Sequence, residues 1–172
     1  MARIDDIIIG KSVAIEEVKN LVQAVSKTST TVLVQGETGT GKEVISRAIH
    51  ELSGRKGKLI SVNCAAIPSE LLESELFGHE KGSFTGAEKT RAGRFEQAHQ
   101  GTLFLDEIGD MAMPLQSKLL RALEQRVIQR VGGNEEIVID FKMREVDLLK
   151  KSPFLWVDLF GSSDTFMAVG FD

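Results

Sequence analysis

The sequence predicts an α/β fold in which helices cover a sheet of parallel strands, and three observations support this. A β-rich run at 31–35 leads through a glycine-rich loop into a helical pattern at 44–50. A second β-rich run at 59–63 follows, so the two strands and the helix form a βαβ unit with parallel strands. A third apolar run, at 102–105, ends in two adjacent carboxylates.

The remaining elements are predicted from apolar spacing and turn residues. One helix should lie against the core with a face made of Ala14, Val18, Leu21, Val22 and Val25. Pro68 opens a helix at 69–77, and helical spacing recurs at 91–100 and at 114–125. The apolar runs 127–131 and 137–139 flank a glycine turn at 132–134 and predict a β-hairpin.

The composition is that of one globular domain. The chain has 172 residues, of which 42% are hydrophobic, and its formal net charge is −4. A mildly acidic chain lacks the basic footprint expected of direct DNA binding. No signal peptide is recognisable, and no apolar run approaches the roughly 18 residues that span a bilayer. We therefore expect a cytoplasmic protein with no direct DNA binding and no membrane association.

Residues 36–43 form the strongest functional motif. They read Gly36, Glu37, Thr38, Gly39, Thr40, Gly41, Lys42 and Glu43, between a predicted strand and a predicted helix. Glycines permit a tight turn with inward-pointing amides, and the helix adds the positive end of its dipole, so such a loop binds phosphate groups. Lys42 can reach the outer phosphates, whereas Glu43 replaces the usual Ser or Thr that binds Mg²⁺. A glycine-rich turn without a ligand is the alternative.

The acidic pair at the end of the third strand is the natural complement of a phosphate loop. Asp106 can hold the hydration shell of Mg²⁺, and Glu107 can polarise an attacking water molecule. Alone, the pair could be a solvated strand end. The phosphate loop upstream favours the catalytic interpretation.

The stretch 78–87 places one aromatic residue, Phe84, among three glycines. An exposed phenylalanine between glycine hinges suggests a tip that binds a partner. Phe84 could equally fold back onto the core.

Other polar and apolar features carry less functional information. Cys64 is the only cysteine, so no intramolecular disulfide can form, and it is predicted to be a small residue near the core. His50, His79 and His99 lack metal-ligand spacing and are predicted to be surface or hydrogen-bonded residues. The apolar run 7–9 could contact an adenine ring or pack in the core.

Together these motifs resemble the central AAA+ ATPase domain of bacterial enhancer-binding proteins, the activators of RNA polymerase carrying sigma-54. The loop at 36–43, including Glu43, is similar to the family's phosphate loop. The stretch 75–87 is similar to its hallmark loop, with Ser83 where the family has alanine, and 98–107 is similar to the strand with the acidic pair. The resemblance covers about residues 7–140. It implies a P-loop NTPase (AAA+) fold, a parallel sheet with flanking helices.

The resemblance also implies roles for matching residues. The loop at 36–43 would bind the phosphates of ATP, Asp106 would bind Mg²⁺, and Glu107 would activate water. Asn63 matches the family's switch residue, which holds the catalytic glutamate until sigma-54 is engaged; the alternative is a turn residue at a strand end. The sigma-54 contact would be the partner loop, which consists of Gly82, Ser83, Phe84, Thr85, Gly86 and Ala87, with Phe84 and Thr85 at its tip. In the family, hydrolysis in a hexameric ring moves these loops and remodels the promoter complex.

The resemblance ends after residue 140, so we expect a C-terminally truncated, incomplete domain at 7–140 and a non-matching tail at 141–172. The family's sensor strand, arginine fingers and helical lid are not recognisable in the tail. That sensor strand lies between the phosphate-loop strand and the acidic-pair strand, so its loss would leave backbone groups unpaired and hinder folding. The run 154–160 could serve as a surrogate strand, but we interpret the tail as unselected sequence.

Two functions of different classes follow. The first is an ATP-binding domain that couples ATP binding and hydrolysis to remodelling of sigma-54 RNA polymerase, with the arginine-assisted hydrolysis expected to be lost. The second is a non-hydrolysing interaction module, or a relic, that acts through the Phe84 loop. Phosphoryl transfer to a small metabolite is disfavoured because the acidic pair suits water activation and no separate substrate segment is recognisable.

Overall fold

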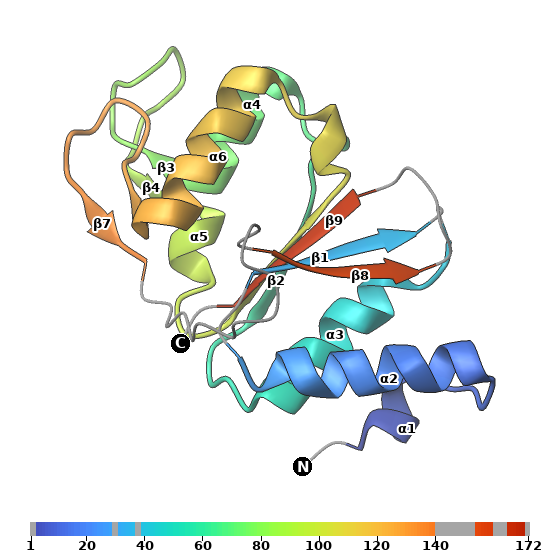
Figure 1. Ribbon diagram of the computed structural model, residues 1–172. Coiled ribbons are helices and arrows are strands. Elements are labelled where there is room, and N and C mark those ends of the chain that lie inside the picture. The colour runs from blue at the N-terminus through green and yellow to red at the C-terminus, as the bar shows by residue number, and fades with distance from the viewer. Residues whose placement is uncertain (1–2, 29–30, 37–38, 140–153, 160–164, 171–172) are drawn as a thin grey trace.

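The computed structural model describes residues 3–28, 31–36, 39–139, 154–159 and 165–170. Its main body is a five-stranded sheet with helices on both faces (Figure 1). The elements are, in order, α1 (Ile4–Ile7), α2 (Val13–Ser26), β1 (Thr31–Gly36), α3 (Lys42–Ser53), β2 (Leu59–Asn63), α4 (Ser69–Phe77), β3 (Gly78–His79), β4 (Arg91–Ala92), α5 (Arg94–Gln97), β5 (Thr102–Asp106), the 3₁₀ helix η1 (Ile108–Asp110), α6 (Met113–Gln125), β6 (Val127–Ile128), β7 (Ile137–Val138), β8 (Phe154–Leu159) and β9 (Thr165–Gly170).

The sheet has the strand order β2-β5-β9-β1-β8. Strand β2 runs parallel to β5, and β1 runs parallel to β8. Strand β9 is antiparallel to both of its neighbours, β1 and β5. Four strands therefore share one direction, as predicted, but the sheet is mixed rather than wholly parallel.

The strand between β1 and β5 is not the one that the sequence suggested. The run 154–160, considered as a possible surrogate, contributes residues 154–159 to β8, which pairs with the outer side of β1. Strand β9 lies in the central position instead, so β1 and β5 are paired on both sides. Residues 140–153, where the sensor strand was not recognised, lie outside the described residues.

Two hydrophobic clusters cover opposite faces of the sheet, and β5 contributes to both. Leu103 and Leu105 pack with α4, α5 and α6, whereas Phe104 packs with α1, α2 and α3. Figure 1 shows these two groups of helices on either side of the strands. The alternation follows from the period of two along a strand. Among the described residues, no helix is long and apolar enough to cross a membrane.

The predicted helices and hairpin are present, with differences at particular residues. Helix α2 buries Val18, Val22 and Val25, but Ala14 and Leu21 remain exposed. The helical spacing at 91–100 yields only the four-residue α5, because Arg91 and Ala92 pair as β4 with β3. The predicted hairpin strand 127–131 is shorter as β6, and Val131 instead bridges to His79.

The structure also places the cysteine, the apolar run 7–9 and the three histidines. Cys64 is buried, and Ile8 lies in the core while Ile9 is 89% exposed. His50 Nδ1 lies 2.9 Å from Thr102 Oγ1, and His79 Nδ1 lies 2.8 Å from Ser74 Oγ. These two histidines are hydrogen-bonded and His99 is exposed, as expected.

Two glycines close the base of the segment that carries the partner loop. Gly78 lies in β3 and Gly93 directly precedes α5, and the backbones of the two residues approach closely. Gly78 also has a left-handed φ of +78°. A Cβ on Gly93 would overlap the Gly78 amide nitrogen and the Leu76 carbonyl oxygen. This close approach leaves no room for a side chain at residue 93.

We predict that Gly93→Ala destabilises the fold by about 2–3 kcal/mol, because the added methyl group meets rigid backbone rather than a flexible side chain. Thermal unfolding followed by circular dichroism should show a Tm about 5–10 °C lower. Gly109→Ala is the matched control, since a Cβ there would have no described neighbour within 4 Å. Equal Tm values for the two variants would contradict the prediction.

Candidate phosphate site and partner loop

The described part of the glycine loop, 39–41, contains two glycines in left-handed backbone conformations. Gly41, which precedes α3, has a φ of +89°, and Gly39 has a φ of +84°. Among the described residues, a Cβ at either position would meet nothing within 4 Å, so glycine is favoured there for its conformation rather than for space. Lys42 begins α3 with a buried side chain, and Thr40 and Glu43 are exposed. Gly36 ends β1, whereas Glu37 and Thr38 lie outside the described residues.

The ends of β2 and β5 bring Asn63 and Asp106 side by side. The two residues are register partners in the parallel pair, and the Cys64 amide donates to the Asp106 carbonyl oxygen at 3.0 Å. Asn63 Oδ1 accepts hydrogen bonds from the amides of Ala65 (2.9 Å) and Ala66 (3.0 Å). In this arrangement the Asn63 carboxamide oxygen stabilises the turn that follows its strand.

Glu107 has a left-handed backbone conformation, with φ 54° and ψ 44°. This conformation costs a residue with a side chain about 1–2 kcal/mol. It turns the chain sharply from β5 into η1, so Glu107 immediately follows Asp106 at the edge of the sheet. Backbone strain of this kind is common at functional sites.

The acidic pair concentrates negative charge in a partly buried place. Burial, followed by the charge of Glu107, raises the pKa of Asp106, while the nearby Lys42 charge opposes this rise. Asp106 Oδ1 is buried and has no hydrogen-bond partner in the described part of the chain. Burial, reinforced by Asp106 and Glu107, raises the pKa of the Cys64 thiol to about 12, so this thiol is protonated at neutral pH.

The structure therefore brings together Lys42, Asn63, Asp106 and Glu107, which the sequence separates by up to 65 positions (107 − 42). A neighbouring cleft of about 740 Å³ lies between the first turns of α4 and α6. Its lining includes Cys64 and Met111 but neither Lys42 nor the acidic pair. The cleft is thus distinct from the predicted phosphate site.

The partner loop lies away from this site. In Figure 1 it is the green loop between β3 and β4, beside the β6–β7 hairpin and far from the end of β1. The Gly82 amide donates to the Ala87 carbonyl oxygen at 2.8 Å, and the Ala87 amide donates to the Phe84 carbonyl oxygen at 3.0 Å. Phe84 is 39% exposed and belongs to neither core cluster, so it is exposed as predicted rather than folded back onto the core. Thr85 is exposed and Ala87 is buried.

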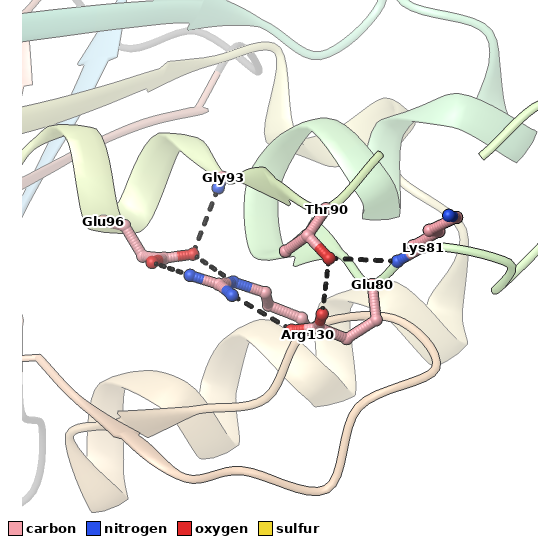
Figure 2. Close-up of polar contacts among 6 residues, drawn as sticks. All are labelled: Glu80, Lys81, Thr90, Gly93, Glu96 and Arg130. Atoms are coloured by element: carbon pink, nitrogen blue, oxygen red, sulfur yellow. Dashed lines mark hydrogen bonds and ion pairs between the residues drawn. The ribbon is translucent and has the colours of Figure 1, made fainter. Parts of the chain in front are cut away.

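A cluster of charged residues, which the sequence did not reveal, fixes the base of this loop (Figure 2). Arg130 binds both carboxylate oxygens of Glu96, with Nε–Oε1 and Nη2–Oε2 distances of 2.9 and 2.7 Å. Its Nη1 also donates to Glu80 Oε1 at 3.0 Å. These contacts raise the pKa of Arg130, chiefly through the hydrogen bonds to Glu96. Arg130 thus joins the hairpin, α5 and the loop base in one cluster, which we call the Arg130 clamp.

The clamp extends to the backbone of the loop. Thr90 Oγ1 donates to Glu80 Oε2 at 2.7 Å and accepts from the Lys81 amide at 3.1 Å. The hydrogen bond from Thr90, followed by that from Arg130, lowers the pKa of Glu80. Residues so far apart in sequence have no local spacing that marks them as partners. Only pairwise variation among related sequences would have indicated their contact.

The fold is that of the α/β P-loop NTPases of the AAA+ class, which the solved structures of NtrX share. Against NtrX from Brucella abortus the TM-score is 0.70 with 36% identity, covering 80% of this chain and 31% of NtrX. For NtrX crystallised in complex with ATP the TM-score is 0.68 with 37% identity, covering 77% and 29%. The predicted fold class is confirmed.

The chain belongs to the sigma-54 interaction domain family, which matches residues 8–146. It is 58% identical over 137 residues to the DNA-binding transcriptional activator HyfR of Escherichia coli (strain K12), covering 79% of this chain and 20% of HyfR. It is 55% identical over 137 residues to a Nif-specific regulatory protein of Azorhizobium caulinodans, covering 79% and 22%. The chain thus spans about a fifth of the length of these relatives, and the resemblance inferred from its motifs is confirmed.

We predict that Asp106→Asn stabilises the nucleotide-free chain at pH 7. Burial and the Glu107 charge raise the pKa of Asp106, so folding penalises its charged form. This penalty is complete above the raised pKa and disappears below the unfolded-state pKa of about 3.9. Melts by circular dichroism should therefore show a higher Tm for the variant at pH 7 and a smaller difference at pH 4. Asp6→Asn, at an exposed position of α1, is the control; a difference that grew towards pH 4 would refute the prediction.

Arg130→Ala should loosen the base of the partner loop. Loss of the paired contact to Glu96 is expected to cost about 1 kcal/mol, because both side chains are only partly exposed. Amide hydrogen exchange should quicken at Lys81, whose amide depends on Thr90 and hence on the clamp. Arg121→Ala, at an exposed position of α6, serves as the control. Unchanged exchange at Lys81 in the Arg130 variant would show that the clamp does not hold the loop.

Proposed function

We propose that this chain is the ATP-binding, sigma-54-interacting AAA+ domain of a transcriptional activator, acting in the cytoplasm. In this proposal it couples ATP binding and hydrolysis to remodelling of sigma-54 RNA polymerase. The observation that carries the proposal is the convergence of Lys42 with Asp106 and Glu107 at one edge of the sheet, in a chain of the sigma-54 interaction family. That edge is where open α/β sheets bind their ligands.

The residues present fit a bound nucleotide. The left-handed glycines at 39 and 41 lie directly before the first turn of α3, and no described residue comes within 4 Å of a Cβ built on either of them. Lys42 lies at that turn, where a lysine meets the outer phosphates of a nucleotide. The similarity to NtrX crystallised in complex with ATP supports the same assignment for Gly36 to Glu43.

The acidic pair fits the accompanying Mg²⁺. This ion takes one or two protein carboxylates and completes its shell with phosphate oxygens and water. Asp106 offers a buried carboxylate oxygen that has no hydrogen-bond partner among the described residues, and its charge is destabilised until a cation is near. When bound, Mg²⁺ neutralises charge on the phosphates. Glu107 is assigned the water-activating role because it follows Asp106 at the same edge.

Asn63 and the partner loop complete the proposal. Asn63 is the register partner of Asp106, close enough in the sheet to sense the acidic pair, so we assign it the switch role. The loop from Gly82 to Ala87, with a partly exposed Phe84 at its tip, is assigned the sigma-54 contact. A homo-oligomeric ring and the lack of direct DNA binding by this chain belong to the same proposal.

A second candidate is a non-hydrolysing module that acts only through the Phe84 loop. The observation that favours it is the separation of that loop from the phosphate site, because the loop has its own clamp and needs no nucleotide to be held in place.

We predict that a slowly hydrolysed ATP analogue with Mg²⁺ raises the Tm of the chain by about 5–10 °C at 100 times its Kd, since ligand at that ratio stabilises the native state by about 2.7 kcal/mol. Lys42→Ala should abolish the shift, because the outer phosphates lose their cation. Glu107→Gln should keep the shift but lower ATP hydrolysis by about 100-fold or more.

The melts and a phosphate-release assay at several protein concentrations separate the two candidates. Hydrolysis that rises steeply with protein concentration would support assembly of the active form. A ligand-dependent Tm shift without hydrolysis at any concentration would favour the non-hydrolysing module. A Tm insensitive to the analogue in the unaltered chain would overturn the assignment of ATP binding.

A further inference from the structure

Phe84 does not extend freely from its loop but rests against one aromatic neighbour. The His79 and Phe84 ring centroids lie 5.0 Å apart with an interplanar angle of 66°, an edge-to-face arrangement. Such a contact is favourable and directional. The contact covers part of the ring that would otherwise be available to a partner, and Phe84 is 39% exposed in this docked position.

The His79 ring is a fixed support. Its backbone pairs with Arg91 in the β3–β4 ribbon and bridges to Val131 of the hairpin segment. Its Nδ1 lies 2.8 Å from Ser74 Oγ on α4, which sets the orientation of the ring. The loop that carries Phe84, in contrast, contains left-handed glycines at 82 and 86. The contact therefore joins a rigid group to an adjustable one.

The residue next to Phe84 opposes the docked position. Ser83 Oγ is buried without a hydrogen-bond partner in the described part of the chain. Ser83 packs on the hairpin turn, where a Cβ added to Gly132 would lie only 2.5 Å from the Ser83 Cβ. A buried hydroxyl without a partner is unfavourable, and it would regain hydrogen bonds to water if the loop lifted from Gly132.

We propose that His79 and Ser83 are opposed positioning residues of Phe84: the His79 ring holds Phe84 docked, and the buried Ser83 hydroxyl favours its release. The inference rests on the proposed function only in naming sigma-54 as the partner that takes Phe84 when it is released. The balance itself is a property of the free chain. The side chain at residue 83 therefore influences how much of Phe84 is exposed.

The balance is tested by fluorine NMR on the full chain labelled with 4-fluorophenylalanine, with the Phe84 resonance assigned by Phe84→Leu. His79→Gln should shift this resonance, because the ring current of His79 is lost, and should raise its relaxation by a soluble nitroxide about two- to tenfold. Ser83→Ala should lower that relaxation. The double variant should fall between the two single variants, an outcome that general loosening of the loop would not produce.

His99→Gln is the matched control, since His99 is an exposed residue between α5 and β5 rather than in the partner loop, and it should leave the Phe84 resonance unchanged. A Phe84 resonance that does not respond to His79→Gln would overturn the inference. So would Ser83→Ala if it raised the exposure of Phe84.

Binding of purified sigma-54 to the same variants separates this inference from the proposed function. His79→Gln should strengthen binding about two- to tenfold and Ser83→Ala should weaken it, whereas Phe84→Ala should abolish it. If Phe84→Ala left binding intact, the proposed partner role would fail while the fluorine result stood. If Phe84→Ala abolished binding but His79→Gln changed neither readout, the inference would fail and the partner role would stand.

Discussion

The burial of β5 on both faces is the constraint on which the rest of the molecule depends. Its side chains alternate between the cluster under α4, α5 and α6 and the cluster under α2 and α3, so a shift of one residue would exchange the two faces. The strand is also paired on both sides, with β2 and β9. Its register is therefore tightly determined. Asp106 and Glu107 have to emerge where the strand ends, next to Asn63 and near Lys42.

This placement of the acidic pair destabilises the nucleotide-free fold but suits the proposed reaction. The carboxylate of Asp106 is partly buried beside a second carboxylate, and the Glu107 backbone is held in a left-handed conformation. Neither feature helps the nucleotide-free chain to fold, but together they keep two carboxylates adjacent at the end of β5, with Asp106 near Lys42. A bound cation and its phosphates would offset the charge. The strain and the charge are thus concentrated at the proposed site, as in many enzymes.

The partner loop is held by a different set of forces from those at the phosphate site. Hydrogen-bonded ion pairs around Arg130 and the close approach of Gly78 to Gly93 fix its base. Its tip contacts His79 through Phe84 and Gly132 through Ser83, and the Phe84 carbonyl oxygen accepts a hydrogen bond from the Ala87 amide within the loop. A rigid base and a weakly held tip allow Phe84 to change its exposure without unfolding the segment. The two regions are nonetheless continuous, since Glu96 of the clamp lies on α5, which leads directly into β5 and its acidic end.

The comparison of prediction with structure shows what local patterns can and cannot specify. The bounds of β2 and α4 and the glycine loop before α3 follow from apolar period, proline and glycine, so the sequence predicted them closely. It also named candidate residues for a phosphate site, and the structure places Asn63 beside Asp106 and Lys42 near Asp106; their roles at such a site stay a prediction. The order of the strands was not predictable in this way. Strand β9, rather than β8, lies between β1 and β5. This choice depends on which whole segment pairs best with the backbone groups of β1 and β5.

By itself, then, the sequence determined the family, the fold class and the identity of the candidate site residues, because each is encoded in contiguous motifs. Only the tertiary structure decided the position of Phe84 against His79, the Arg130 clamp and the burial of the Ser83 hydroxyl. These contacts join residues from separate elements, and their energies arise from packing and from hydrogen-bond geometry in three dimensions. No local pattern contains that information.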